Sequence, residues 1–227
     1  MKVLALTWAL WRDFFRGKAV VFQLVVVVLF ISYFLNPRLG TYEWQYVALY
    51  LGWATLFLAA LSSGLLIWRN ADNKLDILVL KAGKTSFYFA VFLAALLIAV
   101  FWLALISAYI ALLIPIPDQV LPEKIQQLSM AIISNLLVIT ALFLFFSPLT
   151  GRAIEPYLAV IVILISFGIG DQGQPWQQLA VFFPPIVENI KAGVNATGVQ
   201  MVRSLTYLLV ALSLGLVRFI RREFIWP

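Results

Sequence analysis

Residues 86–114 read SFYFAVFLAALLIAVFWLALISAYIALLI, an apolar run of 29 residues without Asp, Glu, Lys or Arg. A helix needs only about 20 residues to cross a bilayer, so this run predicts a spanning helix that tilts or protrudes. Pro115, Pro117 and Asp118 end it. The run therefore places the chain among integral membrane proteins.

Five further apolar segments without charged residues flank this run. They are Ala19–Leu35, Tyr46–Trp68, Ser129–Phe146, Tyr157–Gly170 and Ser204–Phe219. The segment from Tyr157 is the weakest, because 14 residues are few for a crossing, but Pro156 suits the first turn of a helix. The pattern predicts an all-α integral membrane protein with six transmembrane helices.

The basic residues gather on one side of these six segments. Twelve fall on the side of the two termini: Lys2, Arg12, Arg16, Lys18, Arg69, Lys74, Lys81, Lys84, Arg152, Arg218, Arg221 and Arg222. The other side holds Arg38, Lys124, Lys191 and Arg203. By the positive-inside rule, we expect a multi-pass protein of the cell's inner (plasma) membrane with both termini in the cytoplasm.

Composition excludes several functional classes. The chain is 63% hydrophobic and 11% charged, whereas a soluble domain carries about 25% charged residues. Its net charge of +6 comes from residues that flank apolar spans, which indicates contact with anionic lipid headgroups and not with nucleic acid. There is no Cys and no His, so the usual metal ligands and general bases are missing, and we expect neither an enzyme nor a bound cofactor.

Two segments are apolar without being expected to span. Residues 1–18 interleave Trp and Phe with charged residues and stop sharply at Arg16-Gly17-Lys18, which predicts an interfacial amphipathic helix ahead of a single membrane domain, 19–227. The alternative is that they are the start of the first span. The outer stretch Asp171–Arg203 contains Phe182-Phe183-Pro184-Pro185, whose prolines predict a re-entrant segment before the last helix.

The spans lack charge, and this bears on function. Proton-coupled carriers usually hold a carboxylate in the membrane, and ion channels a charged ring or a carbonyl filter. Neither pattern is present. If the chain transports a molecule, we expect the energy to come from another subunit and the cargo to be amphipathic or lipid-like.

The loop between the second and third spans reads as a short helix. Asp72 suits the N-cap, Asp76 the first turn, Lys81 the end and Gly83 the C-terminal cap. Leu75, Leu78 and Val79 share one face. That apolar face needs a partner, which is either another protein or this chain and its lipid.

The chain resembles the membrane (permease) subunit of a type-2 ATP-binding-cassette (ABC) exporter. In that family this loop reads approximately Gly-Thr-Leu-Glu-x-Leu-Leu with a later Pro. Leu75, Asp76, Leu78 and Val79 match it, whereas Asn73 and Lys74 replace Gly-Thr and Ala82 stands in place of Pro. The outer Phe-Phe-Pro-Pro segment and the basic end Leu216–Glu223 are also similar. The length suits the haem-exporter B subunit, one member of this class.

The resemblance implies partners and site residues. Two permease subunits, alike or different, would assemble with two cytoplasmic ABC ATPase subunits. No Gly-x-x-x-x-Gly-Lys-Ser/Thr phosphate loop is present, so we expect ATP hydrolysis on a separate chain. The residues expected to couple to that ATPase are Asp72, Lys74, Leu75, Asp76, Leu78, Val79 and Lys81.

A translocation path between subunits would be lined by the second and fifth spans, as the family implies. Thr55, Ser62 and Ser63 are its candidate lining residues in the second span. The alternative is that Ser62, Ser63 and Gly64 let helices pack closely, as small residues do in membranes. Two other functions stay open for the chain: a non-transporting membrane scaffold or assembly factor, and a secondary carrier, which the uncharged spans disfavour.

The topology can be tested with accessible tags. We expect a tag at Glu123 to react with an impermeant label in intact cells, and tags at Asn73 and the C-terminus to react only after permeabilisation, because the basic residues are retained inside. Labelling at Asn73 in intact cells, or protection at Glu123, would contradict the orientation.

Overall fold

A computed structural model describes residues 2–35, 44–70, 79, 82–113, 122–147, 149, 156–170, 183–192 and 198–221. Every regular element in these ranges is an α-helix. The helices are α1 (Lys2–Phe15), α2 (Lys18–Phe34), α3 (Trp44–Asn70), α5 (Lys84–Leu113), α6 (Pro122–Phe145), α7 (Pro156–Gly170), α9 (Ile186–Ala192) and α10 (Gly198–Arg221). The prediction of an all-α membrane protein is confirmed at this level.

Helices occupy all six segments that the apolar pattern predicts, but they differ in length. Four, α3, α5, α6 and α10, are long and apolar enough to cross a membrane. A fifth crossing results if α1 and α2, which are bent by 71° to each other, count as one broken span. The 15-residue α7 is shorter than a crossing needs. The structure thus supports four to five spans, and the sixth stays a prediction.

Helix starts differ from the predicted ones where helices outrun their apolar stretches. α6 begins at Pro122 instead of Ser129, and α10 begins at Gly198 instead of Ser204. Polar turns such as Glu123-Lys124 continue the helix because backbone hydrogen bonding, and not hydrophobicity, decides where it starts. One consequence is that Arg203 belongs to α10 and not to a loop.

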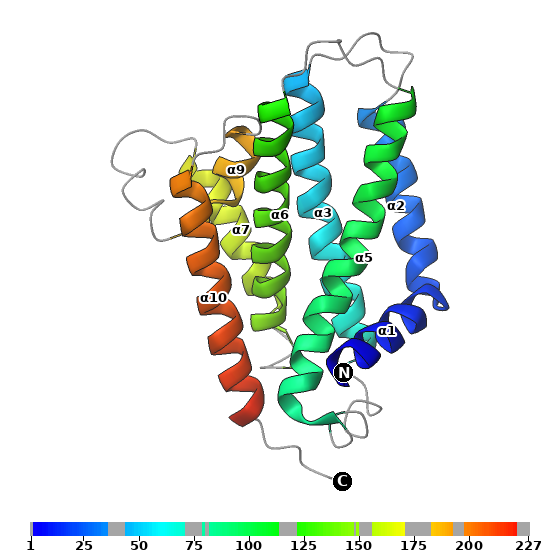
Figure 1. Ribbon diagram of the computed structural model, residues 1–227, viewed down its shortest axis with the longest axis vertical. Helices are drawn as coiled ribbons and strands as arrows, with labels where there is room; N and C mark the ends of the chain where they lie inside the picture. Colours follow the sequence, from blue (N-terminus) through cyan, green and yellow to red (C-terminus); the bar gives the residue numbers. More distant parts are fainter. Residues whose placement is uncertain are drawn as a thin grey trace.

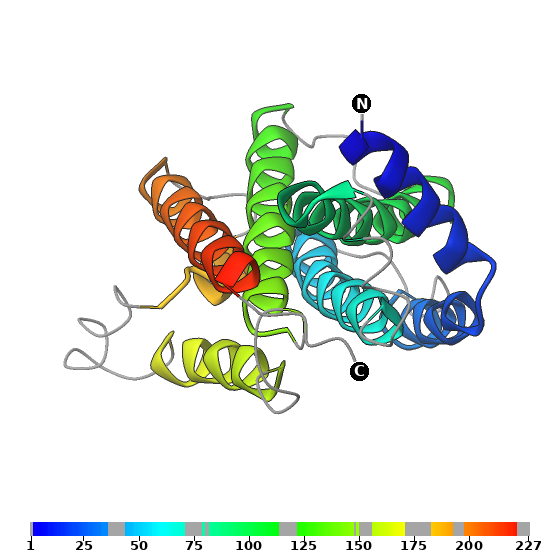
Figure 2. The ribbon, with the colours of Figure 1, turned by 90° about the horizontal axis from the view of Figure 1, so that it is seen from below.

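The helices are arranged around α3, α5 and α6, which pack against one another. α10 lies along α6, and α1 packs against α5 (Figures 1 and 2). α2 and α7 lie on the outside of this group, α7 with its main contacts to α9 and α6 (Figure 2). The helices turn apolar side chains outward as well as inward, as a protein does whose solvent is lipid; exposed examples are Val25, Leu164 and Leu209.

One end of the bundle carries α1 and the last turn of α10 (Figure 1). The Lys84 ammonium, at the start of α5, donates to the Ile220 carbonyl at 2.8 Å. A cation at a helix C-terminus satisfies a free carbonyl and suits the helix dipole. Arg218 lies 5.2 Å from the centroid of the Phe145 ring. These contacts bring the start of α5 and the last turns of α10 together at one end of the bundle.

The helix α1 has two apolar sides. Its inner side, Thr7, Leu10 and Phe14, is buried, and the Thr7 hydroxyl lies 3.5 Å from the Ala90 carbonyl oxygen. Its outer side exposes Leu4 at 70% and Trp8 at 59%, where lipid would cover them. The helix and its break at Arg16-Gly17 agree with the sequence, and its place at a membrane interface stays a prediction.

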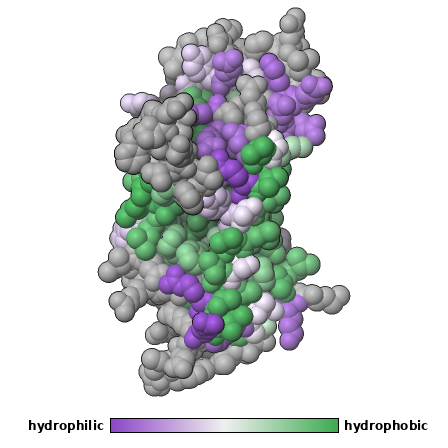
Figure 3. Space-filling view, turned by 90° about the vertical axis from the view of Figure 1, so that its left-hand side faces the viewer, coloured by the Kyte–Doolittle hydropathy of each residue, from purple (hydrophilic) through white to green (hydrophobic). Residues whose placement is uncertain are grey.

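The surface of the molecule matches a membrane protein. On the face that carries α10 and α7, hydrophobic residues cover the middle and hydrophilic residues lie toward both ends (Figure 3). Such a band is what a hydrocarbon layer between two aqueous phases selects.

The contact of α5 with α10 depends on Gly215. A Cβ there would meet the Tyr88 hydroxyl and would lie 3.2 Å from its Cζ and 3.5 Å from the Phe145 Cα. Tyr88 is fully buried, so it has no space to yield. We expect Gly215→Ala to destabilise the protein by about 1–3 kcal/mol, the usual cost of overpacking, measured as a lowered melting temperature in detergent.

Two variants serve as controls for this prediction. Gly64→Ala, where an added Cβ meets nothing within 4 Å, should leave the melting temperature unchanged or slightly raised, since Ala favours helix over Gly. Tyr88→Phe added to Gly215→Ala should restore part of the loss. An unchanged melting temperature in Gly215→Ala would show that α5 and α10 do not approach this closely.

Candidate functional site

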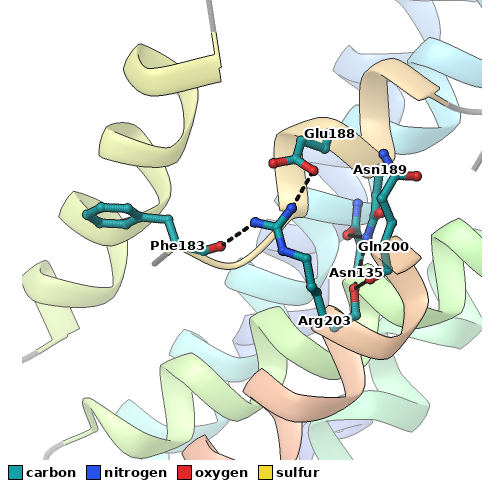
Figure 4. Close-up of polar contacts among 7 residues, drawn as sticks. Asn135, Phe183, Glu188, Asn189, Gln200 and Arg203 are labelled. Atoms are coloured by element: carbon teal, nitrogen blue, oxygen red, sulfur yellow. Dashed lines mark hydrogen bonds and ion pairs between the residues drawn. The ribbon is translucent and has the colours of Figure 1, made fainter. Parts of the chain in front are cut away.

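The most strongly connected polar group in the described part of the chain lies where α9 meets α6 and α10 (Figure 4). The Asn189 amide donates to Asn135 Oδ1 at 2.9 Å and to Ser204 Oγ at 3.2 Å. The Asn135 amide donates to the Ile186 carbonyl at 3.2 Å. Asn135, Asn189 and Ser204 are 2–3% exposed. We call these three residues the amide cluster.

An ion pair lies beside the amide cluster. Arg203 Nη1 is 2.8 Å from Glu188 Oε2, with side chains 23% and 33% exposed. Arg203 Nη2 also donates to the Phe183 carbonyl at 3.3 Å. One arginine on α10 thus contacts both Phe183, just ahead of α9, and Glu188 within α9 (Figure 4). A partly buried charge of this kind persists near hydrocarbon only when it is paired.

Apolar contacts complete the seat of α9. Pro184, Pro185, Ile186, Val187 and Ile190 are buried. A Cβ on Gly52 of α3 would lie 3.1 Å from an Ile190 methyl carbon, so this small residue makes room for α9. The segment Phe183–Ala192 therefore packs into the end of the bundle opposite α1 (Figure 1). Packing against the protein agrees with the sequence, and a re-entrant path through the bilayer stays a prediction.

The three predicted path residues are enclosed within the chain. Thr55, Ser62 and Ser63 are each 0% exposed. The Thr55 hydroxyl donates to the Leu51 carbonyl of its own helix at 2.7 Å, and Ser62 Oγ accepts from Gln23 Nε2 of α2 at 2.7 Å. This burial favours the interpretation in which small residues serve helix packing, and a path role stays a prediction.

The predicted coupling residues lie outside the described residues, except for Val79. The others are Asp72, Lys74, Leu75, Asp76, Leu78 and Lys81. Val79 is 4% exposed, which favours the alternative that this side chain packs onto its own chain. Gly83 has a φ of 86°, and its amide donates to the Val79 carbonyl at 2.8 Å. That is the geometry of a glycine helix cap, as the sequence predicts.

Sequence reasoning missed Gln23 and the amide cluster. Charged residues within spans are the usual sign of a functional site in a membrane protein, whereas Gln23 and Asn135 are neutral amides inside otherwise apolar segments. Such amides are a usable signal, because an amide in hydrocarbon needs a partner. The apolar pattern puts Arg203 just outside the last predicted span, whereas the structure includes it in α10.

The amide cluster and its ion pair join α9 to α6 and α10 through hydrogen bonds and one charge pair. No set of three or more His, Cys, Asp or Glu that could hold a metal ion occurs among the described residues. Comparisons with protein families, with curated proteins and with solved structures each find no match to this chain.

We expect the amide cluster to be worth measurable stability. Asn135→Ala removes the Oδ1 acceptor of the Asn189 amide, and it also removes the donor to the Ile186 carbonyl. Interhelical hydrogen bonds in membranes contribute about 0.6–2 kcal/mol, so the melting temperature in detergent should fall. A double-mutant cycle of Asn135→Ala with Asn189→Ala should give a coupling energy of about 0.5 kcal/mol or more.

Ser166→Ala is the matched control for this cycle. Ser166 is buried too, but its hydroxyl bonds only the Val162 carbonyl of its own helix at 2.8 Å. Its removal should change stability little, and it should show no coupling with Asn189→Ala. Strict additivity between Asn135→Ala and Asn189→Ala would contradict the hydrogen bond that joins these two side chains.

Proposed function

We propose that the chain is the permease subunit of an ATP-driven exporter of the type-2 ABC class, working with a second permease subunit and two separate ATPase subunits. The observation that carries the proposal is that two helices, α1 and α9, lie at the two ends of the bundle and are too short to cross the membrane. α1 lies bent at 71° to α2 at one end, and the short α9 is built into the opposite end. A helical bundle with these two additions is the arrangement to which the sequence is similar.

The distribution of charge supports the same proposal. In the described helices Asp, Glu, Lys and Arg lie near the helix ends, and Arg203, in the second turn of α10, is paired with Glu188. The apolar middle of the bundle gives a coupling ion no carboxylate to bind. A transporter built this way draws its energy from elsewhere, which disfavours a secondary carrier.

Orientation is part of the proposal. We place the end with α1, Lys84 and the last turn of α10 in the cytoplasm, because the basic residues gather there. The ATPase would then meet the loop after α3, and α9 would face the outer side. The membrane would be the cell's inner (plasma) membrane.

Purification tests the function directly. When the chain is isolated from its own cells in mild detergent, we expect an ATPase with a phosphate loop to co-purify, and the complex to hydrolyse ATP. If no ATPase accompanies the chain, and none restores nucleotide-dependent activity, the exporter proposal fails. The runner-up, a scaffold or assembly factor, would instead co-purify with proteins that bind no nucleotide.

The predicted loop helix provides the sharper test of coupling. Truncating an apolar anchor that fills a groove costs about 2 kcal/mol when it is a hot spot, which is roughly a thirtyfold loss of affinity. Leu78→Ala should therefore weaken association with the ATPase by about that factor, measured by titrating the purified ATPase, while membrane insertion is unchanged.

Lys81→Ala and Val79→Ala are the comparison variants for Leu78→Ala. Lys81→Ala should weaken association much less, and its effect should fade at high salt, because a rim charge is screened. Val79→Ala should act on stability and not on association, since Val79 is buried in its own chain. If Leu75→Ala and Leu78→Ala together leave association and transport unchanged, the coupling role of this loop is wrong.

A further inference from the structure

An apolar cavity of about 390 Å³ lies between α2 and α3, and it is open to the surface beside the exposed Leu29 and Phe57. Its floor is formed by Val27 of α2, Ala54 and Leu58 of α3, and Ile106 of α5, and Phe30 and Phe34 flank it. Among the side chains that line it, Tyr33 carries the one hydroxyl, and none is charged. The volume falls in the range of ligand-binding sites, which begins at about 300 Å³.

The cavity forms between two sets of contacts that hold α2 to its neighbours, one at each end of the cavity. Toward α1, the buried Gln23 amide donates to Ser62 Oγ at 2.7 Å. Toward the other end, the rings of Phe34 and Tyr50 lie 5.6 Å apart, and the Tyr109 hydroxyl donates to the Leu35 carbonyl at 3.4 Å. Between these contacts the small Ala54 faces α2. The cavity is therefore bounded at both ends by specific contacts of α2.

The chemistry of the lining excludes most occupants. Water does not fill a cavity that offers no polar partners, and a charged or polar group would lose its solvation there. The occupant must therefore be apolar and narrow enough to lie between α2 and α3.

We propose that this cavity binds one acyl chain of a membrane lipid. The lining runs along α2 from Val26 to Phe34, about 12 Å at 1.5 Å per residue, which is close to the roughly 15 Å that one leaflet contributes to the hydrocarbon core. Tyr33, 82% exposed at the upper end, suits the headgroup level, where Tyr is enriched. The lipid belongs to the leaflet at the α9 end. This binding does not depend on the exporter proposal.

Photo-crosslinking in nanodiscs distinguishes a bound chain from surrounding lipid. The probe is phosphatidylcholine with a diazirine in the middle of one acyl chain, and the labelled residues are mapped by mass spectrometry. Surrounding lipid should label exposed residues outside the cavity such as Val25 and Val28. A chain in the cavity should also label Leu58 and Ile106, which are only 2% and 1% exposed. Labels on Val25 and Val28 without labels on these two would overturn the proposal.

A second measurement uses a variant in which a larger side chain fills the cavity. Ala54→Phe should lower labelling at Leu58 and Ile106 about tenfold, a loss of about 1.4 kcal/mol in binding, and should leave labelling at Val25 unchanged. The matched control is Ala104→Phe, the same change at an exposed position of α5, which should keep wild-type labelling. Equal labelling of Ile106 in both variants contradicts the site, as do crosslinks from the cavity residues to a second copy of the chain.

Discussion

Hydrocarbon offers no hydrogen-bond partner, and the short helix α9 is the element on which this constraint acts most strongly. A seven-residue helix leaves most of its backbone groups without intrahelical partners. Asn135 and Asn189 hold this helix in place: Asn135 donates to the Ile186 carbonyl at the start of α9, and Asn189 ties α9 to α6 and α10. A paired Arg203 holds the turn before it. The irregular segment persists because the bundle, and not the lipid, surrounds it.

The helix α10 connects this polar end of the bundle to the opposite one. Ser204 and Arg203 lie in its early turns, Gly215 packs on Tyr88 farther along, and the Ile220 carbonyl accepts from Lys84 at its end. The outer segment and the start of α5 are thus held by a single rigid element of 24 residues. Its buried positions are Ser204, Ala211, Gly215 and Phe219, which meet individual partners, whereas its exposed side carries apolar residues such as Val202, Leu205, Leu209 and Leu214.

The sequence predicts the helices well and the contacts between them poorly. Apolar length and Lys/Arg counts depend only on the bilayer, so residues 86–114 identify α5 without knowledge of any neighbour. Gln23, Asn135 and Asn189 acquire their roles only when α2, α6 and α9 meet α3 and α10, and no spacing within one segment reveals that. Ser62 shows the difference: the sequence favours packing over a path role for its hydroxyl, but it does not reveal Gln23 as the partner.

The short helix α7 bears on the proposed assembly. At 15 residues it is about 22 Å long, less than the roughly 30 Å of hydrocarbon. It lies outside the main bundle, and it exposes Tyr157, Leu158, Val160, Ile161, Leu164 and Ile165. A helix too short for its bilayer is accommodated by local thinning or by association with another protein. Partnership with a second permease subunit at α7 would relieve this mismatch within the proposed complex, because a partner would cover the exposed apolar side chains that a short helix holds in the bilayer.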